Sequence, residues 1–300
     1  RSPKAVTAPT IELAESSFTY DGTAKKPVVT AVKDGETTIP AEEYTFSYSK
    51  NTNAGTATVT IADKDGGNYT VSGTKTFTIA PKTITSPVVT LAKTSFTYSG
   101  TVQEPAVTVK DGETAIPTSE YTVTYSGNKN VGTATATVTD KHGGNYTFEG
   151  SSASFTITKA MLTVTARNAS RKVDQENPTF ELTYSGFKNG ETESVLTVKP
   201  VATTTATADS PVGDYVITVS GGEDENYDFT YVNGTLTIAE KTVITITAKN
   251  TTRKYGNANP TFEYTVSGGD ITGTPELTCQ ATATSPVISR SEERFSRNAE

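Results

Sequence analysis

The sequence predicts an all-β protein in which small antiparallel β-sandwich domains follow one another in an elongated array. Three observations support this fold class. About one residue in five is Thr, a β-branched residue that suits the half-buried surface of a sheet. Only 34% of the residues are hydrophobic and Trp is absent, so several thin two-layer domains are more economical than one large core. The third observation is internal repetition, which sets the number of domains.

The first two predicted domains, residues 10–80 and 87–158, are near-copies of each other. The segments that match are Ser-Phe-Thr-Tyr at 17–20 and 95–98, Asp-Gly-Glu-Thr at 34–37 and 111–114, and Gly-Gly-Asn-Tyr at 66–69 and 143–146. An ordered set of matches over such a length indicates a duplicated domain.

A second type of repeat fills the rest of the chain, as a predicted domain at 161–239 and an incomplete copy at 243–288. Asn-Pro-Thr-Phe-Glu at 177–181 returns at 259–263. The fourth domain lacks the closing strands of the third, so we expect it to be weakly stable, and we expect the polar tail at 289–300 to be disordered.

Short patterns predict strands and turns within the domains. Apolar and hydroxyl residues alternate at 44–48 and 57–61, as in half-buried strands. Asp34-Gly35 lies between such runs and predicts a hairpin turn, because Gly adopts positive φ easily. Residues 188–196 could form one helical turn capped by Asn189 or Thr192, which leaves a β-grasp-like arrangement open beside the sandwich for the second repeat type.

Charge and cysteine content exclude some classes of partner and site. The formal net charge is −7, which argues against a nucleic-acid partner because phosphate binding needs clustered Lys and Arg. Cys279 is the only cysteine, so neither an internal disulfide nor a thiolate metal cluster can form. The chain opens at Arg1 and contains no segment typical of a signal peptide, membrane span or sorting tail, so we expect an internal part of a longer protein.

The sequence gives no catalytic, cofactor-binding or metal-binding residue, and we expect a non-enzyme. His142 is the only histidine and takes the turn position that Asp65 holds in the first repeat, which indicates a solvent-facing turn residue. Asp63, Asp65 and Asn68 faintly resemble a calcium loop, but the later bidentate Glu is missing. Glu223-Asp224-Glu225-Asn226 is interpreted as a solvated charged loop.

Tyrosines recur at matched positions of the first two repeats. These are Tyr20, Tyr48 and Tyr69 in the first and Tyr98, Tyr125 and Tyr146 in the second. Packing in a core or on a strand face with the phenol tip at the surface is the interpretation favoured by their recurrence. Stacking of exposed rings on sugars is the alternative.

The residues of both repeat types resemble known bacterial surface domains. Residues 162–238, with Asn-Pro-Thr-Phe at 177–180 and Ser-Pro-Val-Gly at 210–213, look like the mostly-beta, glycine-rich (MBG) domain of large bacterial adhesins, and Arg-Lys-Tyr-Gly at 253–256 is close to the same pattern. The first two repeats are similar to Ig-like repeats of gut-bacterial surface proteins, through Phe-Thr-Tyr-Asp-Gly-Thr at 18–23. The resemblance implies secretion or surface display, in an adhesin or stalk, and carries over no ligand residues.

We therefore expect a non-catalytic stalk or spacer on the bacterial surface or in a secreted protein. The junctions between domains are only a few residues long, which favours a stiff string of domains and a monomeric rod. A host glycan or protein would then be bound by other regions of the parent protein. Two alternatives remain open: one domain is itself a module that binds carbohydrate or a host protein, or the chain is a non-catalytic appendage of a secreted enzyme.

Overall fold

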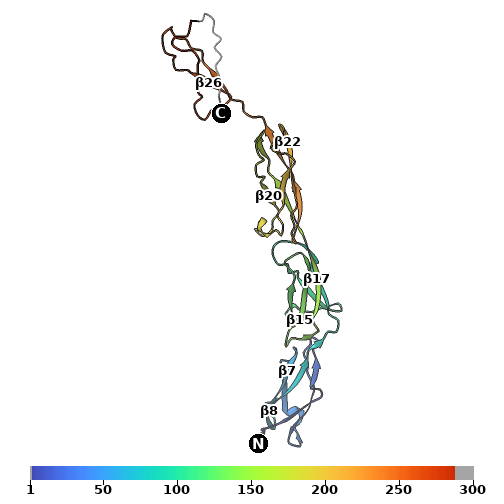
Figure 1. The fold of residues 1–300 in the computed structure, drawn as a ribbon. Helices are drawn as coiled ribbons and strands as arrows, with labels where there is room; N and C mark the ends of the chain where they lie inside the picture. Colours follow the sequence, from blue (N-terminus) through green and yellow to red (C-terminus); the bar gives the residue numbers. More distant parts are fainter. Residues whose placement is uncertain (1, 288–300) are drawn as a thin grey trace. The chain divides into compact units, whose positions relative to one another are not determined.

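The computed structural model describes residues 2–287, and in them the chain is all-β, as predicted (Figure 1). Its helical segments in that range are three 3-10 turns of three residues each. No helix of the described residues is long and apolar enough to cross a membrane. The chain divides into two compact units, of which the first comprises the described residues up to 163 together with 184–199 and 221–230, and the second comprises the remaining described residues.

The first repeat is a two-sheet sandwich. Its elements are β1 (Lys4–Val6), β2 (Thr10–Leu13), β3 (Ser17–Thr19), β4 (Val29–Asp34), β5 (Thr37–Thr38), η1 (Ala41–Glu43), β6 (Tyr44–Ser49), β7 (Gly55–Asp63) and β8 (Tyr69–Ala80). One sheet has the order β1-β8-β7-β6 with β3 also on β8, and the other has the order β2-β4-β5. Residues from both sheets, among them Val32, Val59 and Phe77, form one buried cluster.

The sheets are not purely antiparallel. β1 and β3 both pair with β8 in parallel, β1 at its start (Lys4↔Tyr69) and β3 at its end (Ser17↔Thr78). Alternation of apolar and polar residues predicts a strand but not its direction, so the parallel pairing of these short flanking strands could not be predicted from the pattern. β1 also begins before residue 10, the predicted start of the first domain.

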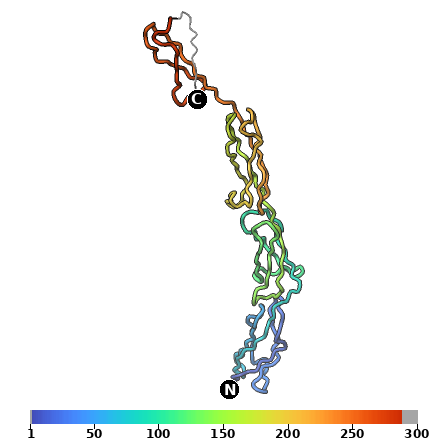
Figure 2. The backbone as a smooth tube through the Cα atoms, viewed as in Figure 1, coloured from blue at the N-terminus to red at the C-terminus, as the bar shows by residue number. Residues whose placement is uncertain are grey.

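The second repeat has the same plan. Its elements are β9 (Lys82–Thr83), β10 (Val88–Leu91), β11 (Ser95–Thr97), β12 (Val107–Asp111), β13 (Thr114–Ala115), η2 (Thr118–Glu120), β14 (Tyr121–Ser126), β15 (Gly132–Asp140), β16 (Tyr146–Thr147) and β17 (Ser151–Thr158). The sheets have the orders β11-β17-β15-β14, β10-β12-β13 and β16-β9. β9 pairs in parallel with β16 (Lys82↔Tyr146), in the register of Lys4↔Tyr69 in the first repeat. Figure 2 shows the path of the backbone in both repeats by colour.

The local patterns are largely confirmed. Ala57, Val59 and Ile61 of β7 are buried and alternate with more exposed residues. Gly35 has a φ of 60° and closes the β4–β5 hairpin, as the Asp-Gly pair predicted. Phe46 differs, since it is 48% exposed although it belongs to the apolar face predicted for its strand. β6 lies at the edge of its sheet, and the ring of Phe46 contacts the ring of Tyr48 there.

The third repeat is also a two-sheet structure. Its elements are β18 (Ala160–Ala166), β19 (Ala169–Lys172), β20 (Leu182–Ser185), η3 (Glu193–Val195), β21 (Val201–Thr204), β22 (Gly213–Ser220), β23 (Tyr227–Val232) and β24 (Gly234–Ala239). The sheet orders are β20-β18-β23 and β19-β24-β22-β21. The predicted helical turn is η3, and its N-cap is Thr192, whose side chain accepts a hydrogen bond from Ser194 N. A β-grasp fold needs a helix that packs on the sheet, and η3 is the longest helical segment among the described residues of this repeat. The sandwich alternative therefore fits, and the β-grasp alternative does not.

The fourth repeat is reduced to β25 (Thr245–Ala248) paired with β26 (Tyr264–Ser267). No side chain between residues 241 and 287 is buried. An arginine links distant loops in both MBG-like repeats: Arg171 donates to Thr207 O at 2.5 Å, and Arg253 donates to Thr282 O. The arginine contact between loops is thus present in the fourth repeat, although that repeat has no buried side chain. Its weak stability stays a prediction. The tail at 289–300 lies outside the described residues.

Candidate functional site

Specific side chains join the first repeat to the second. The rings of Tyr20 and Tyr146 meet edge to face, with centroids 5.4 Å apart and planes at 77°. The backbone N–H of Ala54 donates to Asn145 Oδ1 at 2.8 Å. All these residues belong to the first compact unit. Asn145 Nδ2 also donates to Asn53 Oδ1 at 3.4 Å. One aromatic contact and two hydrogen bonds at Asn145 therefore fix the two repeats to each other.

Asn145 is held in place by a carboxylate from its own repeat. Glu120, at the end of η2, accepts from the backbone N of Asn145 at 2.6 Å and from its Nδ2 at 3.0 Å. The carbonyl of Asn145 accepts from Lys82 N at 2.9 Å, next to the β9–β16 pair. Because the amide NH2 points at Glu120, the orientation of the amide is fixed and Oδ1 is left to face the first repeat.

The second junction, between the second and third repeats, repeats this geometry. The rings of Tyr98 and Tyr227 meet edge to face at 5.5 Å and 82°. Val131 N donates to Asn226 Oδ1 at 2.9 Å, and Ala160 N donates to Asn226 O at 2.9 Å. Its residues also belong to the first compact unit. Tyr98 and Val131 stand where Tyr20 and Ala54 stand in the first repeat, although the third repeat is of a different type.

A shared carboxylate reinforces the second junction. Glu191 accepts from the hydroxyl of Tyr98 at 2.7 Å and from the hydroxyl of Tyr227 at 2.5 Å. Lys188 N donates to the same Tyr227 oxygen at 2.8 Å. Tyr227 is only 1% exposed, and burial together with the bond to Glu191 raises its pKa to about 12. The pKa of Tyr98 is raised for the same two reasons. Both phenols therefore stay neutral donors at physiological pH.

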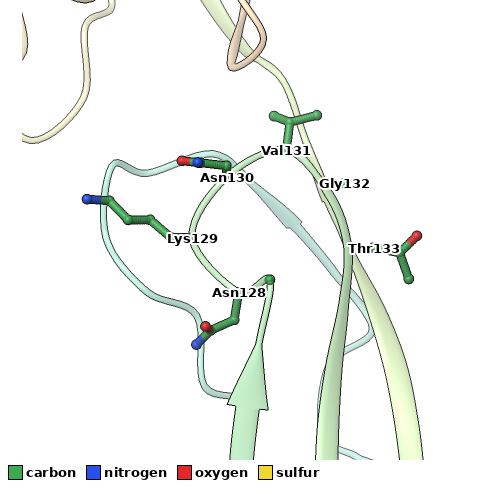
Figure 3. A pocket seen from close by; sticks show the side chains of 7 residues that line it. Asn128, Lys129, Asn130, Val131, Gly132 and Thr133 are labelled. Carbon is green, nitrogen blue, oxygen red and sulfur yellow. The ribbon is translucent and has the colours of Figure 1, made fainter.

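The loop that supplies the Val131 N–H encloses a small hollow, lined by residues 127–133 (Figure 3). Asn128 fixes the loop, since its Nδ2 donates to Gln103 O at 3.0 Å and its carbonyl accepts from Gln103 N at 2.7 Å. In Figure 3 the Lys129 side chain points away from the loop. The hollow is therefore part of the loop that docks on the third repeat, and its one ionisable side chain faces outward.

The acidic turn considered as a calcium loop, and its counterpart in the second repeat, have structural partners. Glu43 and Glu120, at the ends of η1 and η2, accept from the backbone N–H and Nδ2 of the asparagine in the turn of their own repeat, Asn68 and Asn145 respectively. Asp63 ends β7, Asp65 and His142 lie in these turns, and all three residues are exposed. Among the described residues no group of three or more His, Cys, Asp and Glu side chains could hold a metal ion. The turns are thus organised around an asparagine rather than around the Asp oxygens that suggested calcium.

The matched tyrosines have two different roles. Tyr48 and Tyr125 donate to the carbonyls of Pro27 and Pro105, both at 2.6 Å. Burial raises the pKa of both phenols. Tyr20 and Tyr98 instead contact the next repeat. The sequence patterns did not predict a junction role for Asn145, Asn226 or Glu191. An Asn-Tyr pair at the start of a strand recurs in three repeats of two types, and this recurrence was a usable signal.

Comparison with known proteins places the third and fourth repeats in a family. The family model for the MBG domain (YGX type) matches residues 162–237 and 244–289. No curated protein matches the chain.

Among solved structures, the protocadherin gammaB4 extracellular domain is 10% identical over 91% of this chain and 58% of its own, with a TM-score of 0.26. Mouse cadherin-23 EC22-24 is 11% identical over 78% of this chain and 99% of its own, with a TM-score of 0.21. Domains 4-9 of the surface layer protein SbsC are 12% identical over 80% and 49%, with a TM-score of 0.17. At these low scores only the family match is informative: the two C-terminal repeats are MBG domains of the YGX type.

Proposed function

We propose that this chain is a non-catalytic extracellular repeat region of a bacterial surface protein, and that it acts as a stalk or spacer in an adhesin. The observation that carries the proposal is the junction built twice from the same parts. An aromatic pair and a hydrogen bond from a loop N–H to an asparagine link repeats of the same type and of different types. Two MBG domains in the same chain favour surface display.

Short linkers add to the stiffness that a stalk needs. β8 ends at Ala80 and β9 begins at Lys82, so Pro81 alone lies between them. β17 ends at Thr158 and β18 begins at Ala160, which leaves Lys159 alone. A one-residue linker has two soft backbone torsions, and in Pro81 one of them is fixed by the ring. With the junction contacts made, little freedom of bending remains at these two points.

Small-angle X-ray scattering on the whole chain tests the proposal. β8 has 12 residues, so at about 3.3 Å per residue it is about 40 Å long. Three repeats of this length end to end span about 120 Å, and a uniform rod of that length has a radius of gyration of about 35 Å, against about 19 Å for a compact globule of the same chain length. We expect a value of about 35 Å or more. A value near that of the globule would refute the stalk.

Breaking a junction should change the scattering in a defined way. In the double variant Tyr98→Ala with Asn226→Ala, the second junction loses its ring contact and its asparagine acceptor. The chain can then bend there, so the distribution of interatomic distances should broaden and the largest interatomic distance should decrease. His142→Ala, at an exposed turn position, is the matched control and should leave the scattering unchanged. Labelling of intact cells with an antibody against the first repeat tests the extracellular location.

A further inference from the structure

The N-terminal face of the first repeat carries the receiving half of a junction. Asn68 is bound by Glu43 as Asn145 is bound by Glu120: its backbone N donates to Glu43 at 2.5 Å and its Nδ2 donates at 2.9 Å. The carbonyl of Asn68 accepts from Lys4 N at 2.8 Å, as that of Asn145 accepts from Lys82 N. The chain enters in the same way as well, with Pro3 before β1 and Pro81 before β9.

This receiving half has no occupant among the described residues. Asn68 Oδ1 accepts no hydrogen bond from them, whereas the Oδ1 atoms of Asn145 and Asn226 each accept one from a neighbouring repeat. Tyr69 contacts no other ring in the described part of the chain, whereas Tyr146 and Tyr227 each do. Asn68 is exposed, while its two counterparts are half-buried.

The surface is preorganised for docking. Both oxygens of Glu43 are engaged by Asn68, and these hydrogen bonds lower the pKa of the Glu43 carboxyl, which therefore stays ionised at neutral pH. Because Asn68 Nδ2 donates to Glu43, the amide of Asn68 is oriented before any partner arrives. A surface that does not rearrange on docking loses less free energy to ordering.

We propose that this face, formed by Asn68 and Tyr69, is a docking surface for the C-terminal end of another repeat of the first type. The inference rests on the proposed stalk function and names its partner. The occupant must present a tyrosine after its short parallel strand and a backbone N–H just before its β7-type strand, as Tyr20 and Ala54 do. An MBG end does not fit, because Val173 of the third repeat takes the tyrosine position: its N donates to Ala239 O as Tyr20 N donates to Ala80 O.

An extended chain tests the proposal. A second copy of residues 3–80 is inserted directly before Pro3 of the full chain, so that its Ala80 joins Pro3 as Ala80 joins Pro81. Segmental isotope labelling distinguishes the two identical repeats. Amide hydrogen exchange is then measured at Ala54 of the added copy and at Ala54 of the original repeat, whose N–H is bound by Asn145.

We expect the added Ala54 to be protected within about threefold of the original Ala54, because both would be held by the same contacts. If the original is protected and the added one exchanges about tenfold faster or more, the docking surface is refuted while the stalk junctions stand. If neither Ala54 is protected, both the junctions and this inference fail.

A second variant separates docking from folding of the receiving turn, since replacing Asn68 would also disturb Glu43. Tyr20→Leu in the added copy alone leaves the receiving surface intact and keeps an apolar side chain. Protection of the added Ala54 should fall about fivefold or more, with the original Ala54 unchanged. Unchanged protection of the added Ala54 would contradict docking through the tyrosine.

Discussion

Removal of one hydroxyl from the second junction is the most direct test of its chemistry. Tyr98 is 4% exposed and donates to Glu191 at 2.7 Å. Tyr98→Phe keeps the ring contact with Tyr227 and removes this bond. A hydrogen bond to a charged group contributes about 1.5 to 3 kcal/mol. Glu191 keeps its bond from Tyr227, so its charge is not left without a donor, and we expect a cost near 1.5 kcal/mol, at the lower end of this range.

The first junction provides a matched control. Tyr20 makes the equivalent ring contact with Tyr146, but its hydroxyl donates to none of the described residues. Tyr20→Phe therefore removes a hydroxyl without removing a hydrogen bond within the protein. We expect a change below about 0.5 kcal/mol.

Native-state hydrogen exchange reports each junction separately. Val131 N–H is bound across the second junction and Ala54 N–H across the first. Since about 1.4 kcal/mol corresponds to a factor of ten, Tyr98→Phe should make Val131 exchange about tenfold faster through local opening and should leave Ala54 unchanged. Equal exchange of Val131 in wild type and variant, under conditions where exchange reports opening, would refute the role of the Tyr98–Glu191 bond.

Three further perturbations have defined outcomes. The pKa of Tyr227 is raised to about 12 whereas an unfolded tyrosine ionises near 10, so the stability from this group is fully present below pH of about 10 and is lost as pH rises toward 12; titration of tyrosinate absorbance alongside exchange at the second junction should show them changing together. At Gly100 a Cβ would lie 2.6 Å from the loop of the third repeat, whereas at Gly22 the nearest atom is 4.0 Å away; both have positive φ, so Gly100→Ala should cost about 1 to 3 kcal/mol more than Gly22→Ala in denaturant unfolding. Asp174 has a φ of 57° and an exposed ion pair with Lys241 at 2.8 Å. Both Asp174→Gly and Asp174→Ala lose that ion pair, but only Ala keeps a Cβ at positive φ, so the Gly variant should be more stable than the Ala variant by about 1 kcal/mol in thermal unfolding. Equal stability of the two variants would exclude backbone strain at this position.

The sequence was most informative where the structure depends on neighbours along the chain. The alternation at 57–61 predicted which side of β7 is buried, and Asp34-Gly35 predicted the hairpin between β4 and β5. Thr192 was one of two candidate caps, and it is the one that binds Ser194 N. Each of these features is decided by a few adjacent residues, so local pattern is sufficient.

Local sequence patterns could not predict the junction contacts, for a physical reason. Asn145 occupies a turn where asparagine is favoured by backbone conformation alone, so its identity does not show that Oδ1 faces Ala54, a residue 91 positions away. The parallel pairing of β1 with β8 is equally non-local. Glu191 lies in a segment interpreted as a helical turn, and nothing near it in sequence indicates the two tyrosines that it binds.

The donor at each junction is a main-chain N–H, and this bears on how such chains can change. Ala54 and Val131 differ in side chain yet make the same hydrogen bond. A receiving repeat therefore does not depend on which amino acid its neighbour places in that loop. Gene duplication or exchange can put a new domain behind an old one without a compensating substitution at that position, provided that the tyrosine and the asparagine are kept. The change from one domain type to the other along this chain is the outcome that such a tolerant joint permits.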